Sequence, residues 1–151
     1  MVSDFCGAGE IFGKEKALTF AGPYHRSAQT EDLDVTSGGW LEFEFFFPPI
    51  GFDGSNPQCK TGYIGRVYVQ YSTDQGATWT NIAILNPSTL RQEKFFYNQL
   101  DVPEAAQTNQ TRFQFIQPVF EAARDAWALD NVKVHQCLTL SLSISLSLSL
   151  N

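Results

Sequence analysis

The stretch WLEFEFFF, residues 40–47, decides the fold class of this chain. Every second residue from Leu41 to Phe47 is apolar, and Glu42 and Glu44 lie between them. Because successive side chains of a β-strand point to opposite faces, this alternation predicts a strand with one buried face and one wet face. Strands of that kind are typical of an antiparallel sheet that packs one side on a core.

Similar short runs occur on both sides of this stretch, with clusters of turn-forming residues between them. The runs after it are RVYVQYS (66–72), TNIAIL (80–85) and TRFQFIQ (111–117), and the turn clusters are PPIGFDGSNP (48–57), TDQG (73–76) and NPS (86–88). Only Glu104–Gln107 and Phe120–Arg124 have even briefly helical patterns. About eight to ten strands with this spacing predict an all-β fold, an antiparallel jelly-roll sandwich.

Composition and charge narrow the class of protein. The chain has 151 residues, enough for one domain with a real core, and 43% of them are hydrophobic. The formal net charge of −6 and the isoelectric point near 4.7 argue against a nucleic-acid partner. No apolar run approaches the roughly 20 residues of a membrane helix, and the first residues lack the pattern of a signal peptide.

The end of the chain is a two-letter repeat. Residues 138–150 read LTLSLSISLSLSL. The alternation is formally that of a strand, but its low complexity favours translated non-coding sequence that packs poorly. We therefore expect a start without fixed structure at 1–5, one domain at 6–136, and a Ser/Leu tail at 137–151 that is not native structure.

The segment STDQGATW, residues 72–79, predicts a tight hairpin turn. The Asp74 carboxylate can accept hydrogen bonds from backbone N–H groups, and Gly76 tolerates a positive φ. Ser72 can add a hydroxyl bond, and Trp79 can fold back under the turn. This spacing resembles the Asp-box motif, which is a peripheral structural turn in the families that carry it.

The neighbouring segments resemble a reelin subrepeat. The matching stretches are CGAGEIFGKEKALTFAG (6–22), RSAQTEDLDV (26–35), VYVQYSTDQGATW (67–79), LDVPEAAQTNQTRFQFIQ (100–117) and WALDNVKV (127–134). The Asp-box hairpin and the cysteine after WALDNVKV are similar to the second subrepeat of a reelin repeat. The resemblance implies an extracellular structural and interaction module that stacks with neighbouring repeats and EGF-like modules and binds lipoprotein-receptor-type proteins.

The three cysteines follow no zinc-ligand spacing, so by themselves they are either free thiols or one pair with one left over. The resemblance implies a Cys6–Cys59 disulfide. It also implies that Cys137 would be the first cysteine of an EGF-like module.

Calcium is the cofactor that the sequence and the resemblance favour. Hard oxygen ligands suit Ca²⁺, and similar jelly rolls hold a structural calcium ion beside the first and last strands. We expect the ligands to come from Asp34 and Asp130, with Asp32 and Glu10 as further candidates.

Catalytic patterns are sparse. His25 and His135 lie near opposite ends of the domain, without a serine or cysteine in a nucleophile setting, so we expect no enzyme activity. Asn109 begins the sequon Asn-Gln-Thr and is a glycosylation site if the chain is secreted.

The alternative function is a carbohydrate-binding jelly roll. Such a module would present exposed aromatic rings on a concave face, and Phe46, Trp40 and Tyr68 are the candidates.

Overall fold

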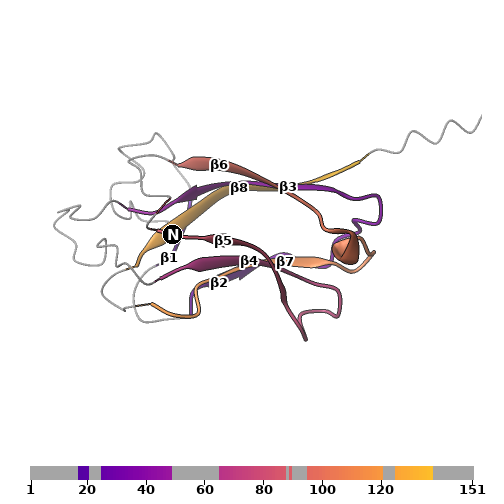
Figure 1. The fold of residues 1–151 in the computed structure, drawn as a ribbon, viewed down its shortest axis with the longest axis horizontal. Coiled ribbons are helices and arrows are strands. Elements are labelled where there is room, and N and C mark those ends of the chain that lie inside the picture. The colour runs from indigo at the N-terminus through magenta and orange to yellow at the C-terminus, as the bar shows by residue number, and fades with distance from the viewer. Residues whose placement is uncertain are drawn as a thin grey trace, which may run out of the picture.

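The computed structural model describes residues 17–20, 25–48, 65–87, 89, 95–120 and 125–137. Within them lie eight strands in two antiparallel sheets, of order β1-β8-β3-β6 and β2-β7-β4-β5. Their bounds are β1 Leu18–Phe20, β2 Ser27–Gln29, β3 Gly39–Phe46, β4 Val67–Ser72, β5 Thr80–Leu85, β6 Phe96–Asp101, β7 Arg112–Ile116 and β8 Trp127–Gln136. Figure 1 shows the two sheets as separate layers, with β3, β6 and β8 in one and β2, β4 and β7 in the other. The predicted all-β sandwich is confirmed.

The stretch that decided the fold class is the central strand β3. Leu41, Phe43, Phe45 and Phe47 are each no more than 1% exposed, so the alternation in the sequence is the alternation of core and surface. The Phe43 ring meets Phe115 of the opposite sheet edge-on, with ring centroids 4.9 Å apart. Aromatic contacts of this kind hold the two layers together.

The described part of the chain contains one short helix, the 3-10 helix Glu104–Ala106. It falls within the predicted segment Glu104–Gln107. Most of the second predicted helical segment, Phe120–Arg124, lies outside the described residues. β6 was not among the predicted strands, because its pattern of half-buried and exposed residues has no strong apolar alternation.

Gly39 permits a close approach of β3 to β8. A Cβ at this position would lie 1.8 Å from the backbone oxygen of His135, and the residue has φ +129°. Only glycine fits there, because any side chain would collide with the backbone of β8. The residue therefore sets the pairing of β3 with the last part of β8, where Gly39 lies opposite Gln136.

β8 carries an extra residue in its middle. Glu42 pairs with Lys133 and Glu44 pairs with Asp130, so two residues of β8 lie opposite the single Phe43. One of the two, Asn131, has φ 51°. This β-bulge keeps Asp130 and Lys133 on the same outer face although three positions separate them.

A buried polar cluster joins four segments at one end of the sandwich. Arg26 is 2% exposed and donates to Gln117 Oε1 at 2.8 Å and to the Asp125 backbone oxygen at 2.6 Å. Gln117 in turn donates to the backbone oxygen of Gly65 at 3.0 Å. Burial lowers the pKa of Arg26, and the nearby charge of Asp125 opposes that effect. The cluster connects the segments before β2, β4 and β8 with the end of β7.

Candidate functional site

The turn between β4 and β5 is built from the residues that the sequence singled out. Asp74 accepts from the backbone N–H of Thr78 at 2.9 Å, and from the hydroxyls of Thr78 and Ser72 at 2.6 and 2.7 Å. These hydrogen bonds, with that from the Thr78 hydroxyl largest, lower the pKa of Asp74 from 3.8 to about 2. Gly76 has φ +91°, and a Cβ at this position would lie 3.3 Å from the ring of Trp79.

Arg112 attaches this turn to the rest of the domain. Its guanidinium donates to both carboxylate oxygens of Asp32, and also to the backbone oxygen of Gln75 at 3.0 Å. The hydrogen bond from Arg112 is the main cause that lowers the pKa of Asp32. The turn is therefore tied to the segment before β3.

The outer face of the β1-β8-β3-β6 sheet carries three rows of side chains, which we call the β6-β3-β8 face. The register places three residues in each row: Asp101, Trp40 and His135; Gln99, Glu42 and Lys133; Tyr97, Glu44 and Asp130. Their chain neighbours on β3, Leu41 and Phe43, point into the core, so the nine side chains share the outer surface.

Two aromatic rings and a carboxylate contact one another in two adjacent rows of this face. Trp40 stacks on the His135 ring with centroids 4.9 Å apart and an interplanar angle of 12°. Glu42 lies 2.9 Å from His135 Nε2 and 3.3 Å from Lys133 Nζ. Partial burial acts to raise the pKa of Glu42, but Lys133 and His135 together lower it. Tyr97, which is 59% exposed, extends the aromatic surface across the sheet.

The predicted calcium ligands do not come together. Asp32 is paired with Arg112, and Asp34 accepts from the backbone N–H and the hydroxyl of Thr36. The backbone oxygen of Asp34 accepts from the side chain of Gln136, six residues along β8 from Asp130. That separation is roughly 20 Å along a strand, so Asp34 and Asp130 cannot share one ion.

Asp130 instead lies beside Glu44 on the neighbouring strand. Asn131 orients both carboxylates, because its backbone N–H donates to Asp130 at 2.8 Å and its side chain donates to Glu44 at 2.9 Å. Two carboxylates suit a hard cation but supply only part of the six to eight oxygens of a calcium site. Among the residues that the structure describes, no three His, Cys, Asp or Glu side chains form a group that could hold a metal ion. Glu10 lies outside these residues.

The histidines do not form a catalytic arrangement within the described ranges. His25 Nδ1 lies 3.0 Å from the Ser27 hydroxyl on the surface, and in that part of the chain no carboxylate contacts His25 to orient it. His135 is held against Trp40 and Glu42. Among the described residues, neither histidine lies between a nucleophile and a carboxylate that would orient it as a base.

The remaining predicted residues are placed as follows. Asn109 is exposed, and the hydroxyl of Thr111 is buried and donates to the backbone oxygen of Ala106. Cys137 is exposed just after β8. Cys6 and Cys59, the predicted disulfide, lie outside the described residues, as does most of the Ser/Leu tail.

The three aromatic rings named for the alternative function do not share a face, so the choice of these three residues was wrong. Trp40 lies on the β6-β3-β8 face, and Phe46 is 3% exposed and stacked on Phe95. Tyr68 lies between the buried residues Val67 and Val69, so it points outward from the other sheet.

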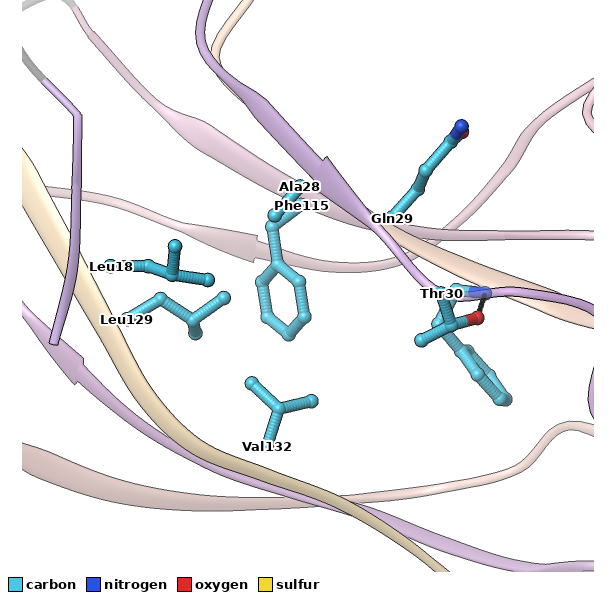
Figure 2. A pocket seen from close by; sticks show the side chains of 8 residues that line it. Leu18, Ala28, Gln29, Thr30, Phe115, Leu129 and Val132 are labelled. Carbon is cyan, nitrogen blue, oxygen red and sulfur yellow. Dashed lines mark hydrogen bonds between the residues drawn. The ribbon is translucent and has the colours of Figure 1, made fainter. Parts of the chain in front are cut away.

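An apolar pocket of about 140 Å³ opens between the sheets at the edge formed by β1 and β2. Figure 2 shows Leu18, Leu129 and Val132 on one side of it and Phe115 on the other. The dashed bond in the figure joins the Thr30 hydroxyl to the backbone N–H of Phe113, at 3.0 Å. This pocket has polar groups only near Gln29 and Thr30, so it offers no set of groups for chemistry.

The fold defines a β-sandwich module of two antiparallel four-stranded sheets. The family model described as reelin subrepeat B matches residues 1–135. The chain therefore belongs to the reelin subrepeat B family, as its motifs predicted. No helix in the described ranges is long and apolar enough to cross a membrane.

Solved structures with a similar fold include three proteins of low sequence identity. A family 16 carbohydrate-binding module has 18% identity and a TM-score of 0.48, over 82% of this chain and 78% of that one. The C-terminal domain of EclA, a sugar-binding protein, has 13% identity and a TM-score of 0.49, over 80% and 77%. CBM28, specific for non-crystalline cellulose, has 12% identity and a TM-score of 0.45, over 80% and 76%.

Proposed function

We propose that this domain is a non-catalytic, extracellular structural and interaction module of a longer reelin-like chain. It packs against neighbouring repeats and takes part in binding cell-surface receptors of the lipoprotein-receptor type. Family membership supports the proposal that the domain is part of a longer reelin-like chain. The β6-β3-β8 face supports the proposal that it binds other proteins.

The observation that carries the proposal is the stacked Trp40–His135 pair beside Glu42 and Lys133. Tryptophan and tyrosine are enriched at the centres of protein–protein interfaces, and polar groups surround them at the rim. The stacking and the ion pairs hold these side chains in place before a partner arrives, which reduces the entropy lost on binding. A protein partner with complementary charges fits this face.

Hydroxyl-radical footprinting tests this proposal directly. We expect Trp40 and Tyr97 to be oxidised more slowly in the parent chain, or in its receptor complex, than in the isolated domain. Tyr68 on the opposite sheet serves as the internal control, because its reactivity should stay the same. Equal reactivity of Trp40 and Tyr97 in all three samples would contradict the proposal.

A structural calcium ion is part of the proposal. Asp130 and Glu44 would supply two of its oxygen ligands, and Glu10 is the candidate for a third. The ion would then fix the bulged part of β8 against β3.

The extracellular setting also predicts two covalent modifications, the Cys6–Cys59 disulfide and a glycan on Asn109. The exposure of Asn109 supports the second.

A further inference from the structure

The outer face of the β2-β7-β4-β5 sheet carries a row of amide side chains that crosses all four strands. The register places Gln29 opposite Gln114, Gln114 opposite Gln70, and Gln70 opposite Asn81. We call these four residues the amide row. With neighbouring strands about 4.8 Å apart, the row is roughly 14 Å long.

Two hydrogen bonds connect three of the four amides, and both bonds run in the same direction along the row. Gln114 Nε2 donates to Gln70 Oε1 at 3.3 Å, and Gln70 Nε2 donates to Asn81 Oδ1 at 2.8 Å. Each amide can donate two hydrogen bonds and accept two. Among the described residues, the two bonds therefore use only a small part of the hydrogen-bonding capacity of the four amides. Gln114 is the least accessible of them, at 7% exposed. Figure 2 shows that Gln29 extends away from the apolar side chains of the pocket beneath it.

An apolar strip runs beside the amide row. Tyr68 lies opposite Ile116 on one side and opposite Ile84 on the other, and Ile84 is 49% exposed. On the other side of the row, a shallow hollow of about 470 Å³ is lined by Gln29, Thr30, Glu31, Asp32 and Arg112. The ion pair of Arg112 with Asp32 forms the charged end of this surface.

From this juxtaposition we infer that the amide row binds a neutral oligosaccharide. Sugar hydroxyls both donate and accept, as amides do, and the C–H faces of a sugar ring pack on aromatic and aliphatic side chains. An extended chain of sugar rings could make contacts along the length of the row and lie with one side on the Tyr68 strip. An ionic ligand fits less well, because the amides carry no charge to compensate for its loss of water.

This site is independent of the proposed function, because it lies on the sheet opposite the β6-β3-β8 face. Its amides are attached to paired strands, so they are arranged before a ligand binds. A loop would not offer that geometry.

Side-chain amide signals in ¹⁵N–¹H NMR spectra provide the test. The probes are cellohexaose, xylohexaose and chitohexaose as neutral oligosaccharides, and heparin as an acidic one. We expect at least one neutral probe to shift the signals of Gln29, Gln70, Asn81 and Gln114 while leaving those of Gln99 and Gln110 unchanged. A response to heparin alone, to none of the probes, or outside the row would overturn the inference.

Substitutions in the row give a second measurement. Gln70→Leu should weaken binding of the responding probe at least tenfold in calorimetric titrations, and Gln29→Ala should weaken it by less. Gln110→Leu, at an exposed loop position, is the matched control and should bind normally. If Gln70→Leu does not fold, Gln29→Ala decides the result, because Gln29 is exposed and its substitution should not disturb the fold. Unchanged affinity in Gln29→Ala would then contradict the site.

Discussion

Arg112 donates hydrogen bonds to the Asp32 carboxylate through both Nε and Nη2, although the two residues are 80 positions apart in the sequence. The same guanidinium bonds the Gln75 backbone in the Asp-box turn. One side chain of β7 therefore positions both the segment before β3 and the β4–β5 hairpin. Because the guanidinium fork is planar and fixed, a lysine cannot reproduce the three bonds.

Arg112→Lys is expected to lower the melting temperature slightly and to shift the backbone amide signals of residues 74–78. Asp32→Asn should lower the melting temperature too, and the double variant should lose less than the sum of the two, because the residues contact each other. Strictly additive losses in thermal denaturation would show that the pair does not act together.

Asp74→Asn should lower stability at neutral pH but not at pH 2. The folded pKa of Asp74 is about 2, below its ordinary 3.8, so the charged carboxylate stabilises the folded state. That contribution is complete above about pH 5 and is lost as the pH falls through 3.8 toward 2. Melting temperatures of the two proteins should therefore converge between pH 4 and pH 2. A constant difference over this range would contradict the assignment.

Arg26→Leu should destabilise the domain, because it leaves the buried acceptors on Gln117 and Asp125 without their donor, at about 1–3 kcal/mol each. Chemical denaturation measures the change. Arg66→Leu is the matched control, since Arg66 is exposed, and it should change the free energy of unfolding by less than about 0.5 kcal/mol. A similar decrease in the free energy of unfolding in both variants would show that the Arg26 cluster does not stabilise the domain more than an exposed arginine does.

Added calcium should raise the melting temperature, and EDTA should lower it. At a hundred times the dissociation constant, the bound ion would add about 2.7 kcal/mol of stability. Asp130→Asn should abolish the response, whereas Asp34→Asn should keep it, because Asp34 is bonded to Thr36 far from Asp130. The reverse result would place the ion at the other end of β8, and no response at millimolar calcium would end the calcium proposal.

Peptide mapping under non-reducing conditions should recover Cys6 linked to Cys59. Closing a loop of this length stabilises by roughly 3–4 kcal/mol in the chain-entropy model, less any strain. Recovery of Cys6 linked to Cys137 would contradict the predicted Cys6–Cys59 disulfide.

The sequence predicted what depends on local pattern. The strong alternation around Phe43 and the turn residues around Asp74 are both readable within eight residues, and both appear in the structure as expected. The family motifs extended this prediction to the whole domain.

Features that depend on strand register were not predictable in the same way. The amide row aligns Gln29 with Asn81 only after four strands are paired. Asp32 meets Arg112 only when the segment after β2 pairs with the start of β7. The resemblance favours Asp34 and Asp130 as calcium ligands, and the sequence does not show that Asp34 lies near Gln136, at the other end of β8 from Asp130. Plain alternation through WALDNVKV would also have turned Lys133 inward, since nothing in that string marks the bulge.

The bulge at Asn131 makes one position of the last strand tolerant of a change in length. Deleting Asn131 would leave Leu129, Asp130, Val132 and Lys133 in regular alternation, with each side chain still on its present face. Deleting any single residue between Lys133 and Gln136 would instead exchange core and surface for every residue beyond it. Related domains can therefore differ by one residue inside this strand at Asn131, while the rest of β8 can change only by substitution or in steps of two residues.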